Sequence, residues 1–357
     1  MRLALRLAKK GMGWTSPNPN VGAIVVKNGR VIGKGFHRKF GGPHAEVFAL
    51  QEAGTEARNA TLYVTLEPCS HYGKTPPCAD RIIEAGLKRV VVATPDPNPL
   101  VNGKGIAKLR KAGIEVTIGV EADKAKALNA PFFKFVRTGL PFVTLKIAQT
   151  IDGKIATPSG DSRWISGKAS RRLVHRWRFQ MDAVLVGIGT VLQDDPQLTV
   201  RMVRGRNPIR FVLDPHLRIP ETAKILNLPD SSKTIVVTGE ENRKKTAFIQ
   251  EKGAEVLFVP QNRDELFDVT ELLAAVAQKN ILSILVEGGR GVFSAFLKQR
   301  AFDRVAVFVA PKIAGAGIGP FDDISIERMD EALPLRLFHK RRVGEDWLFE
   351  FEPQEAV

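Results

Sequence analysis

The stretch Glu67-Pro68-Cys69-Ser70-His71-Tyr72-Gly73-Lys74-Thr75-Pro76-Pro77-Cys78 contains both cysteines of this 357-residue chain, and His44-Ala45-Glu46 lies upstream of it. One histidine and two cysteines supply three protein ligands for zinc, which leaves the fourth tetrahedral position open to water. Glu46 is a neighbouring carboxylate that need not bind the metal. The residues therefore predict a catalytic zinc site with His44, Cys69 and Cys78 as ligands.

Two other interpretations of the cysteines are a disulfide and a pair of inert buried thiols. A disulfide implies an oxidising compartment. Residues 1–10 form a basic amphipathic pattern without the apolar run of a signal peptide. Inert thiols would leave the proline before Cys69 and the upstream His44-Ala45-Glu46 unexplained. Metal binding is the favoured interpretation.

The spacing of the metal residues indicates the chemistry. Zinc nucleobase deaminases combine His-x-Glu with Pro-Cys and a second Cys, and their Glu shuttles protons. Most of them place two residues between the cysteines, whereas this chain places eight. Zinc would lower the pKa of its water to give hydroxide, and Glu46 would carry the proton to the leaving ammonia. The pattern predicts hydrolytic deamination of an amino-substituted N-heterocycle.

Charge is concentrated in the first part of the chain. Residues 1–140 have 22 Lys+Arg and 10 Asp+Glu, so they carry +12 of the net charge of +15. A basic domain suits nucleic acid, a phosphorylated small molecule or simply a solvated surface. No nucleic-acid motif accompanies the charge. No run reaches the roughly 18 apolar residues of a membrane span. We expect a soluble, cytoplasmic protein with no nucleic-acid or membrane partner, and a homo-oligomer is compatible with the sequence.

Two series of alternating strands and helices predict two α/β domains. Asn28-Gly29 predicts a hairpin between strands 21–26 and 30–36. The first series continues with strands 61–66, 89–94 and 115–119, and with helices 1–12, 45–53, 79–85, 104–112 and 122–136. Thr138-Gly139-Leu140-Pro141 then interrupts the pattern. The second series has strands 142–148, 182–187, 208–213, 234–238, 255–259, 281–286, 303–309 and 345–352, and helices 168–179, 241–252, 264–278 and 291–299. The predicted domains are residues 1–139 and 140–357.

Two glycine-rich turns in the second series are candidates for phosphate binding. Ile284-Leu285-Val286-Glu287-Gly288-Gly289-Arg290-Gly291 is a buried strand that enters such a turn, and Gly187-Ile188-Gly189-Thr190 is another. Backbone N–H groups at such turns bind phosphate, and two of them in one sheet suit a dinucleotide. Taken alone, the turn at Glu287-Gly288-Gly289 would favour an ordinary strand–helix connection. Asp152, in Ile151-Asp152-Gly153, is either a turn residue or part of a site.

Further motifs resemble a known family over essentially the whole chain. They include Pro17-Asn18-Pro19-Asn20-Val21-Gly22, Gly35-Phe36-His37, Thr150-Ile151-Asp152-Gly153-Lys154, Trp164-Ile165-Ser166 and Val286-Glu287-Gly288-Gly289. Together with the eight-residue cysteine spacing, they resemble the bifunctional deaminase and reductase of riboflavin biosynthesis. The resemblance implies a cytidine-deaminase-like three-layer α/β/α domain followed by a dihydrofolate-reductase-like α/β domain. Members of the family usually have a few residues before the position that corresponds to Met1.

The resemblance implies two consecutive reactions on a phosphorylated pyrimidine. The first domain would deaminate 2,5-diamino-6-(5-phosphoribosylamino)pyrimidin-4-one with one Zn²⁺. The second would use NADPH to reduce the ribosyl chain, which gives 5-amino-6-(5-phosphoribitylamino)uracil. The alternative is a nucleic-acid deaminase of the transfer-RNA type with an accessory reductase-like domain. The cysteine spacing and the matched second half argue against that alternative.

The resemblance also assigns site residues in both domains. In the deaminase, Glu46 would be catalytic, and Asn18, His37 and Lys74 would contact the substrate, with Lys74 reaching its phosphate. NADPH would contact Ala148, Trp164, Thr190, Asp194, Gly289, Arg290, Gly291, Val292, Phe293, Ser294 and Ala295. The sugar phosphate would contact Lys146, Ser162, Arg178, Leu198, Arg201 and Glu287.

Overall fold

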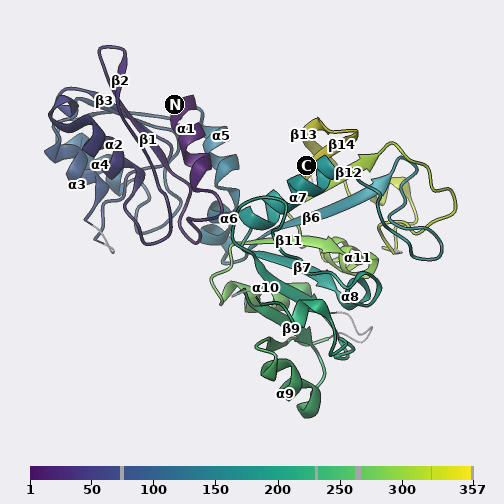
Figure 1. The fold of residues 1–357 in the computed structure, drawn as a ribbon. Helices are drawn as coiled ribbons and strands as arrows, with labels where there is room; N and C mark the ends of the chain where they lie inside the picture. The colour runs from purple at the N-terminus through teal and green to yellow at the C-terminus, as the bar shows by residue number, and fades with distance from the viewer. Residues whose placement is uncertain (73–75, 230–231, 262–266, 323, 355–357) are drawn as a thin grey trace. The chain divides into compact units, whose positions relative to one another are not determined.

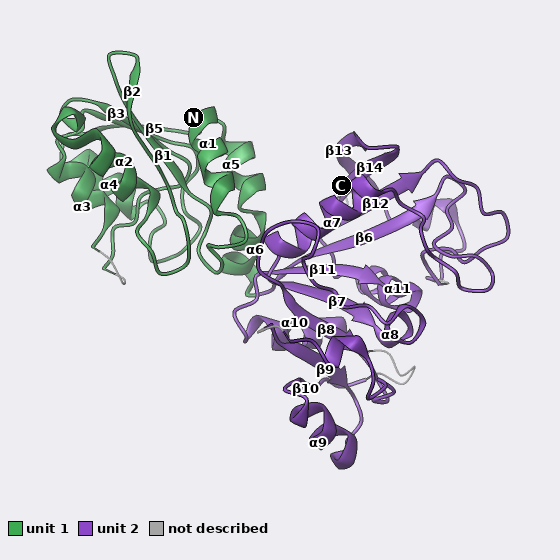
Figure 2. Cartoon of the chain, viewed as in Figure 1, with its two compact units in different colours: residues 1–139 green, residues 140–357 purple. Residues whose placement is uncertain are grey.

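A computed structural model of the chain describes residues 1–72, 76–229, 232–261, 267–322 and 324–354. The chain forms two compact units, Met1–Gly139 and Leu140–Val357 (Figure 2). Each unit has a β-sheet with helices packed on it (Figure 1). No helix of the described ranges has both the length and the apolar character that a membrane crossing needs.

The sheet of the first unit has five strands in the order β2-β1-β3-β4-β5. The predicted hairpin is confirmed, because β1 pairs antiparallel with β2 and Asn28 and Gly29 both have positive φ. β3, β4 and β5 run parallel to one another. The strands are β1 (Gly22–Lys27), β2 (Arg30–Phe36), β3 (Thr61–Val64), β4 (Arg89–Val92) and β5 (Glu115–Ile118).

Helices cover both faces of this sheet, so the unit has three layers. One face buries its alternate apolar residues against α2 (Ala45–Ala53), α3 (Cys78–Glu84) and α4 (Lys104–Lys111). On the other face, Leu5 of α1 (Arg2–Ala8) packs with Ala93 and with Ala125 of α5 (Ala122–Leu128). The predicted layering of helices around one sheet is therefore confirmed.

The predicted single helix 122–136 is wrong, because Asn129 separates α5 from α6 (Ala130–Thr138). Its side chain is 1% exposed and bonds to the backbone of Asn20, a residue 109 positions away. Pro131 lies in the first turn of α6, and because a proline has no backbone N–H to donate to the preceding turn, the chain begins a new helix here. Helical periodicity does not reveal the contact between Asn129 and Asn20.

The sheet of the second unit has nine strands in the order β10-β9-β8-β7-β11-β6-β12-β14-β13. The pairs from β10 to β12 are parallel, and β14 and β13 add antiparallel pairs at one edge. The strands are β6 (Phe142–Thr150), β7 (Ala183–Gly187), β8 (Ile209–Leu213), β9 (Thr234–Thr238), β10 (Glu255–Phe258), β11 (Ser283–Gly288), β12 (Arg304–Ala310), β13 (Leu335–Val343) and β14 (Asp346–Pro353).

Alternate residues of these strands face two different groups of helices. Leu145, Leu185 and Val286 pack in the core formed with α10 (Val269–Ala277) and α11 (Arg290–Lys298). The opposite face packs against α8 (Ile188–Asp194), α9 (Arg243–Glu251) and α7 (Lys168–Gln180). Lys146 and Glu287 alternate with these core residues and so belong to the face covered by α7.

Two elements of this unit are not predicted from the sequence. α8 directly follows Gly187, where the two glycines of Gly187-Ile188-Gly189 indicate only a turn. β13 is exposed along nearly its whole length and contains Lys340, Arg341 and Arg342. An exposed edge strand has no apolar alternation, so its pattern does not predict a strand.

Candidate active sites

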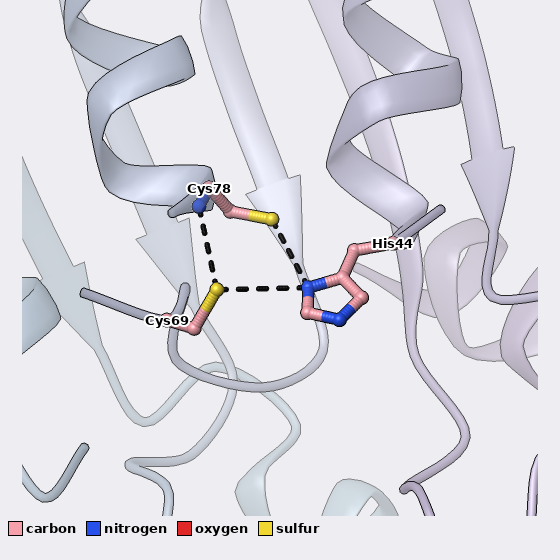
Figure 3. A group of neighbouring side chains, drawn as sticks. All are labelled: His44, Cys69 and Cys78. Atoms are coloured by element: carbon pink, nitrogen blue, oxygen red, sulfur yellow. Dashed lines mark hydrogen bonds between the residues drawn. The ribbon is translucent and has the colours of Figure 1, made fainter. Parts of the chain in front are cut away.

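Three side chains of the first unit meet at the start of two helices (Figure 3). His44 directly precedes α2 and Cys78 begins α3, while Cys69 lies in the loop after β3. His44 Nδ1 lies 3.2 Å from Cys78 Sγ and 3.6 Å from Cys69 Sγ, and all three ligand atoms lie within 4.8 Å of one another. Two sulfurs and one imidazole nitrogen at such distances suit tetrahedral zinc.

The protonation states of this cluster are strongly coupled. Hydrogen bonds from the Cys78 side chain and the His44 ring lower the pKa of Cys69 to about 4. The hydrogen bond between His44 and Cys69 raises the pKa of His44 to about 9. The hydrogen bond between Cys78 and Cys69 raises the pKa of Cys78. Metal binding needs neutral imidazole and two thiolates, so it must displace protons from this cluster.

Glu46 lies in the first turn of α2, two residues after His44. The residue is 3% exposed, and burial raises the pKa of its carboxyl group. Its Oε2 atom has no hydrogen-bond partner among the residues that the structure describes. A buried acceptor without a partner beside a metal-ligand cluster suits a water or a substrate N–H group.

Asn18 and His37 form a hydrogen-bonded pair near the ligands. His37 is 2% exposed, and its ring meets the His44 ring edge-on with the centroids 5.5 Å apart. His37 Nδ1 lies 3.0 Å from the carbonyl oxygen of Pro43, so that nitrogen must donate. His37 Nε2 then accepts from Asn18 Nδ2 at 3.2 Å, and burial lowers the pKa of His37. The pair fixes the orientation of the Asn18 amide.

Sequence reasoning missed Glu67, which anchors a loop beside the metal ligands. Glu67 Oε2 accepts from the backbone N–H groups of Asp96 and Gly103, at 3.2 and 3.0 Å. Glu67 Oε1 accepts from the N–H group of Ile106 at 3.1 Å. Asp96 is 7% exposed, and burial raises its pKa to about 6. In the sequence, Glu67 is distinguished only as the acidic residue directly before Pro68-Cys69.

A cavity of about 950 Å³ lies in the second unit, and its lining includes residues at the carboxyl ends of β6, β7, β8 and β11. In parallel α/β sheets this edge is where ligands bind. Nearly all the predicted cofactor and substrate contacts of this unit line the cavity. They are Lys146, Ala148, Ser162, Trp164, Arg178, Thr190, Asp194, Leu198, Arg201, Glu287, Gly289, Arg290, Gly291, Val292, Phe293 and Ala295.

A buried ion pair forms part of the cavity wall. Arg178 donates from Nε and Nη2 to the two carboxylate oxygens of Glu287, at 2.5 and 2.9 Å, and from Nη1 to the carbonyl oxygen of Thr199. Burial alone would raise the pKa of Glu287, but the charge and hydrogen bonds of Arg178, together with the charges of Lys146 and His175, outweigh it and the pKa is lowered. Burial lowers the pKa of Lys146 beside them, and Glu287 partly offsets this effect.

His175 and Arg201 extend this wall. The backbone N–H of Arg201 donates to His175 Nδ1 at 3.3 Å. Burial, followed by the charges of Arg178 and Arg201, lowers the pKa of His175 to about 4, so the ring is neutral at physiological pH. The Arg201 side chain is exposed and lines the cavity. No pattern in the sequence distinguishes His175, which is one helical turn before Arg178.

Glycines shape the part of the cavity between β7 and β11. A Cβ atom on Gly187 would lie 2.8 Å from the Val292 side chain, and Gly289 has a φ of 101°. A Cβ atom on Gly189 would meet no atom within 4 Å. The Val292 side chain therefore packs closely against the backbone at Gly187, whereas the space beside Gly189 is open. Such exposed backbone suits a bound phosphate group.

Comparisons with known proteins match both units. The family model of the cytidine and deoxycytidylate deaminase zinc-binding region matches residues 1–94, and that of the RibD C-terminal domain matches residues 141–349. The riboflavin biosynthesis protein RibD of Aquifex aeolicus is 49% identical over 99% of this chain and 97% of that protein. The chain belongs to the RibD family. It is therefore a deaminase and reductase of riboflavin biosynthesis.

Solved RibD structures agree with this assignment. Form 1 of Acinetobacter baumannii RibD has a TM-score of 0.88 at 42% identity and covers 99% of this chain and 98% of that chain. A diaminohydroxyphosphoribosylaminopyrimidine deaminase/5-amino-6-(5-phosphoribosylamino)uracil reductase of Thermotoga maritima has a TM-score of 0.87 at 42% identity, covering 99% and 97%. The RibD fold combines a cytidine-deaminase-like domain with a dihydrofolate-reductase-like domain. The RibD domains imply zinc, a nicotinamide cofactor and a small-molecule substrate.

Three of the sequence-predicted RibD residues need separate comment. Lys74 lies outside the described residues. Ser294 is 4% exposed and does not line the cavity, because its hydroxyl donates to the Arg290 carbonyl and accepts from the Asp322 N–H. The Asp152 carboxylate accepts from the N–H groups of Ala314 and Gly315, so it fastens one loop to another. This contact supports the turn interpretation of Asp152.

Proposed function

We propose that residues 1–139 deaminate 2,5-diamino-6-(5-phosphoribosylamino)pyrimidin-4-one and that residues 140–357 reduce the product to 5-amino-6-(5-phosphoribitylamino)uracil with NADPH. The family assignment supports the reaction types. The observation that carries the first step is the unpartnered, buried Oε2 of Glu46 beside the cluster of His44, Cys69 and Cys78.

In the deaminase site, His44, Cys69 and Cys78 would hold one zinc ion. When bound, zinc lowers the pKa of a water molecule and so supplies a nucleophile at neutral pH. Glu46 would accept one proton from the attacking water and deliver it to the ring nitrogen, and it would then carry a second proton from the newly formed C–OH group to the amino group, which leaves as ammonia. Burial raises the pKa of Glu46, which suits a group that must both accept and return a proton.

Asn18 and His37 would position the pyrimidine. The Asn18 amide donates to His37 Nε2, so its Oδ1 atom can accept a hydrogen bond from the substrate. We assign the substrate phosphate to Lys74 on the sequence alone, because an ammonium group in the eight-residue insert is a suitable point charge for phosphate.

In the reductase site, the substrate would lie against Lys146, Ser162, Leu198, Arg201 and Glu287. The guanidinium of Arg178 donates its hydrogen bonds to Glu287 and to the Thr199 carbonyl, so Arg178 positions Glu287. Arg201 lines the cavity and is the better phosphate ligand. Reduction adds hydride to the sugar C1′ and a proton to the ring oxygen that is released. The lowered pKa of Lys146 suits its Nζ as the source of that proton.

NADPH would bind across the glycine-rich turns. The N–H groups of the turn 289–291 and of α11 would hold its phosphates, and Ala148, Trp164, Thr190 and Asp194 would line other parts of the cofactor. When bound, the nicotinamide supplies the hydride. The glycines Gly187, Gly189 and Gly289, which line the cavity, support this assignment.

We further propose that RibD acts in the cytoplasm on its phosphorylated pyrimidine without a nucleic-acid partner. The basic charge of residues 1–140 supports attraction of a phosphorylated substrate.

A coupled assay with the full chain, the diaminopyrimidinone substrate and NADPH tests both steps. We expect ammonia release and NADPH consumption, and metal analysis should find one zinc per chain. Glu46→Gln should keep zinc but release no ammonia, while it still reduces supplied deaminated intermediate. Glu84→Gln, an exposed position on α3, is the matched control and should behave like the wild type. Normal ammonia release by Glu46→Gln would refute the role of Glu46.

A further inference from the structure

We propose that Arg218 recognises the 2′-phosphate of NADPH and thereby makes the reductase prefer NADPH to NADH. The inference rests on the proposed reductase function, and it adds the residue that distinguishes the two cofactors. Arg218 lies in the loop after β8, at the carboxyl edge of the nine-stranded sheet.

The position of Arg218 along the cavity suits the adenosine end of the cofactor. Lys146 on β6 and Glu287 on β11 mark the end where the substrate would bind. The sheet order then continues through β7 to β8, where Pro215, Arg218 and Lys224 line the same cavity. Three steps between neighbouring strands span about 14 Å. A dinucleotide with its phosphates at the turns of β11 and β7 would therefore place its adenosine near the end of β8.

The acidic residue at the end of β8 does not face the cofactor. In many dinucleotide folds, an Asp or Glu near a strand end binds the ribose hydroxyls of NAD, and an arginine accommodates the 2′-phosphate of NADP. Here Asp214 is 0% exposed. Its two oxygens accept from the backbone N–H groups of Arg218 and Ile219, at 2.9 and 2.7 Å. Asp214 therefore shapes the loop that presents Arg218, and its own carboxylate is engaged by the backbone of that loop.

Among the residues that the structure describes, Arg218 is the cavity-lining cation at this end that has no ion-pair partner. Lys224 Nζ already pairs with Asp195 at 3.0 Å. His216 pairs with Glu240 through Nδ1 at 2.7 Å. The Arg218 guanidinium is exposed and makes no hydrogen bond or ion pair with any residue placed in the structure. A planar guanidinium can bind phosphate through two parallel N–H groups.

Equilibrium binding to the full-length protein tests the proposal without relying on turnover. Calorimetric titrations with NADP⁺, NAD⁺, 2′,5′-ADP and ADP would compare the wild type with Arg218→Ala. Loss of one charge-assisted contact should weaken NADP⁺ and 2′,5′-ADP about 10- to 100-fold. NAD⁺ and ADP should change less than about twofold, since they lack the phosphate that forms this contact.

Two further variants sharpen the result. Arg218→Lys should restore part of the NADP⁺ affinity, because it keeps the charge but loses the two-pronged geometry. Arg243→Ala removes an exposed arginine at the start of α9 and should change neither affinity.

Several outcomes would overturn the proposal. They are equal weakening of NADP⁺ and NAD⁺ in Arg218→Ala, unchanged NADP⁺ affinity, or a larger selective loss in Lys224→Ala. A wild type that binds NADP⁺ and NAD⁺ equally would remove the discrimination but leave the reductase function intact. A wild type that binds neither would refute the reductase function as well.

Discussion

The side-chain amide of Asn129 forms two hydrogen bonds with the backbone of Asn20. Asn129 Oδ1 accepts from the Asn20 N–H at 2.7 Å, and Asn129 Nδ2 donates to the Asn20 carbonyl at 3.0 Å. The residue that separates α5 from α6 thus holds the segment that carries Asn18.

Asn129→Ala should impair the deaminase selectively. The variant leaves two backbone groups of Asn20 without their partner, which destabilises the first unit by about 1–3 kcal/mol. We expect a higher KM for deamination and unchanged reduction of supplied intermediate, measured in separate assays. Gln51→Ala, an exposed amide on α2, is the control. An unaltered KM would show that the Asn18 segment is ordered without Asn129.

Glu287→Gln should disable the reductase by leaving two cations without their counter-charge. The Glu287 side chain is 6% exposed and faces Arg178 and Lys146. Breaking one partner of such a buried pair destabilises a protein by about 3–5 kcal/mol. Urea unfolding followed by a probe in the second unit measures the loss, and NADPH consumption measures activity.

The matched control for this variant is Glu255→Gln. Glu255 pairs with Lys233 and Lys279 at the surface, with 34% of its side chain exposed. Its loss should change the unfolding free energy by less than about 1 kcal/mol. Equal effects of the two substitutions would contradict the importance of burial at Glu287.

The stability of the second unit should fall in acid partly through His175. Its pKa is lowered from 6.5 to about 4 in the folded protein, mainly by burial. The unfolded chain binds the proton more readily than the folded protein. The stability linked to neutral His175 is therefore fully present above pH 6.5 and is lost as the pH falls from 6.5 to about 4. His175→Asn keeps an acceptor but does not titrate. Urea midpoints at about pH 7 and about pH 5 should differ less in this variant than in the wild type. An identical difference would exclude the linkage.

Gly105→Ala should disrupt the support of the metal site. A Cβ atom on Gly105 would lie 2.0 Å from the carbonyl oxygen of Pro68, so α4 or the cysteine loop must move. We expect weaker zinc retention during dialysis against a chelator, and slower deamination. Gly319→Ala is the control, since its Cβ atom would meet nothing within 4 Å. Wild-type zinc retention in Gly105→Ala would show that the loop can adapt.

The sequence predicts the parts of RibD that depend on local patterns. Asn28-Gly29 determines a hairpin, and the buried runs of β7, β8 and β9 are recognisable strands. His44, Cys69 and Cys78 were predicted to come together because few chemistries need that combination, and their ligand atoms do lie together.

Features that depend on distant contacts were not predictable in this way. The contact of Asn129 with Asn20 joins residues 109 positions apart, and β13 is an edge strand that is exposed along nearly its whole length. The ion pair of Arg178 with Glu287 is likewise not revealed by any spacing. The neutral state of His175 likewise depends on burial that appears only in the folded chain.

Glu67 gives the zinc loop a property that its ligands alone would not have. By accepting three backbone N–H groups from residues 96–106 one position before Pro68-Cys69, it makes the first cysteine part of a preformed framework. This segment loses its conformational entropy when the chain folds. Metal binding therefore need not order it, and no further entropy loss of this segment opposes capture of the ion. RibD should therefore acquire its metal as a nearly rigid receptor at Cys69, with little rearrangement of that segment between the metal-free and metal-bound protein.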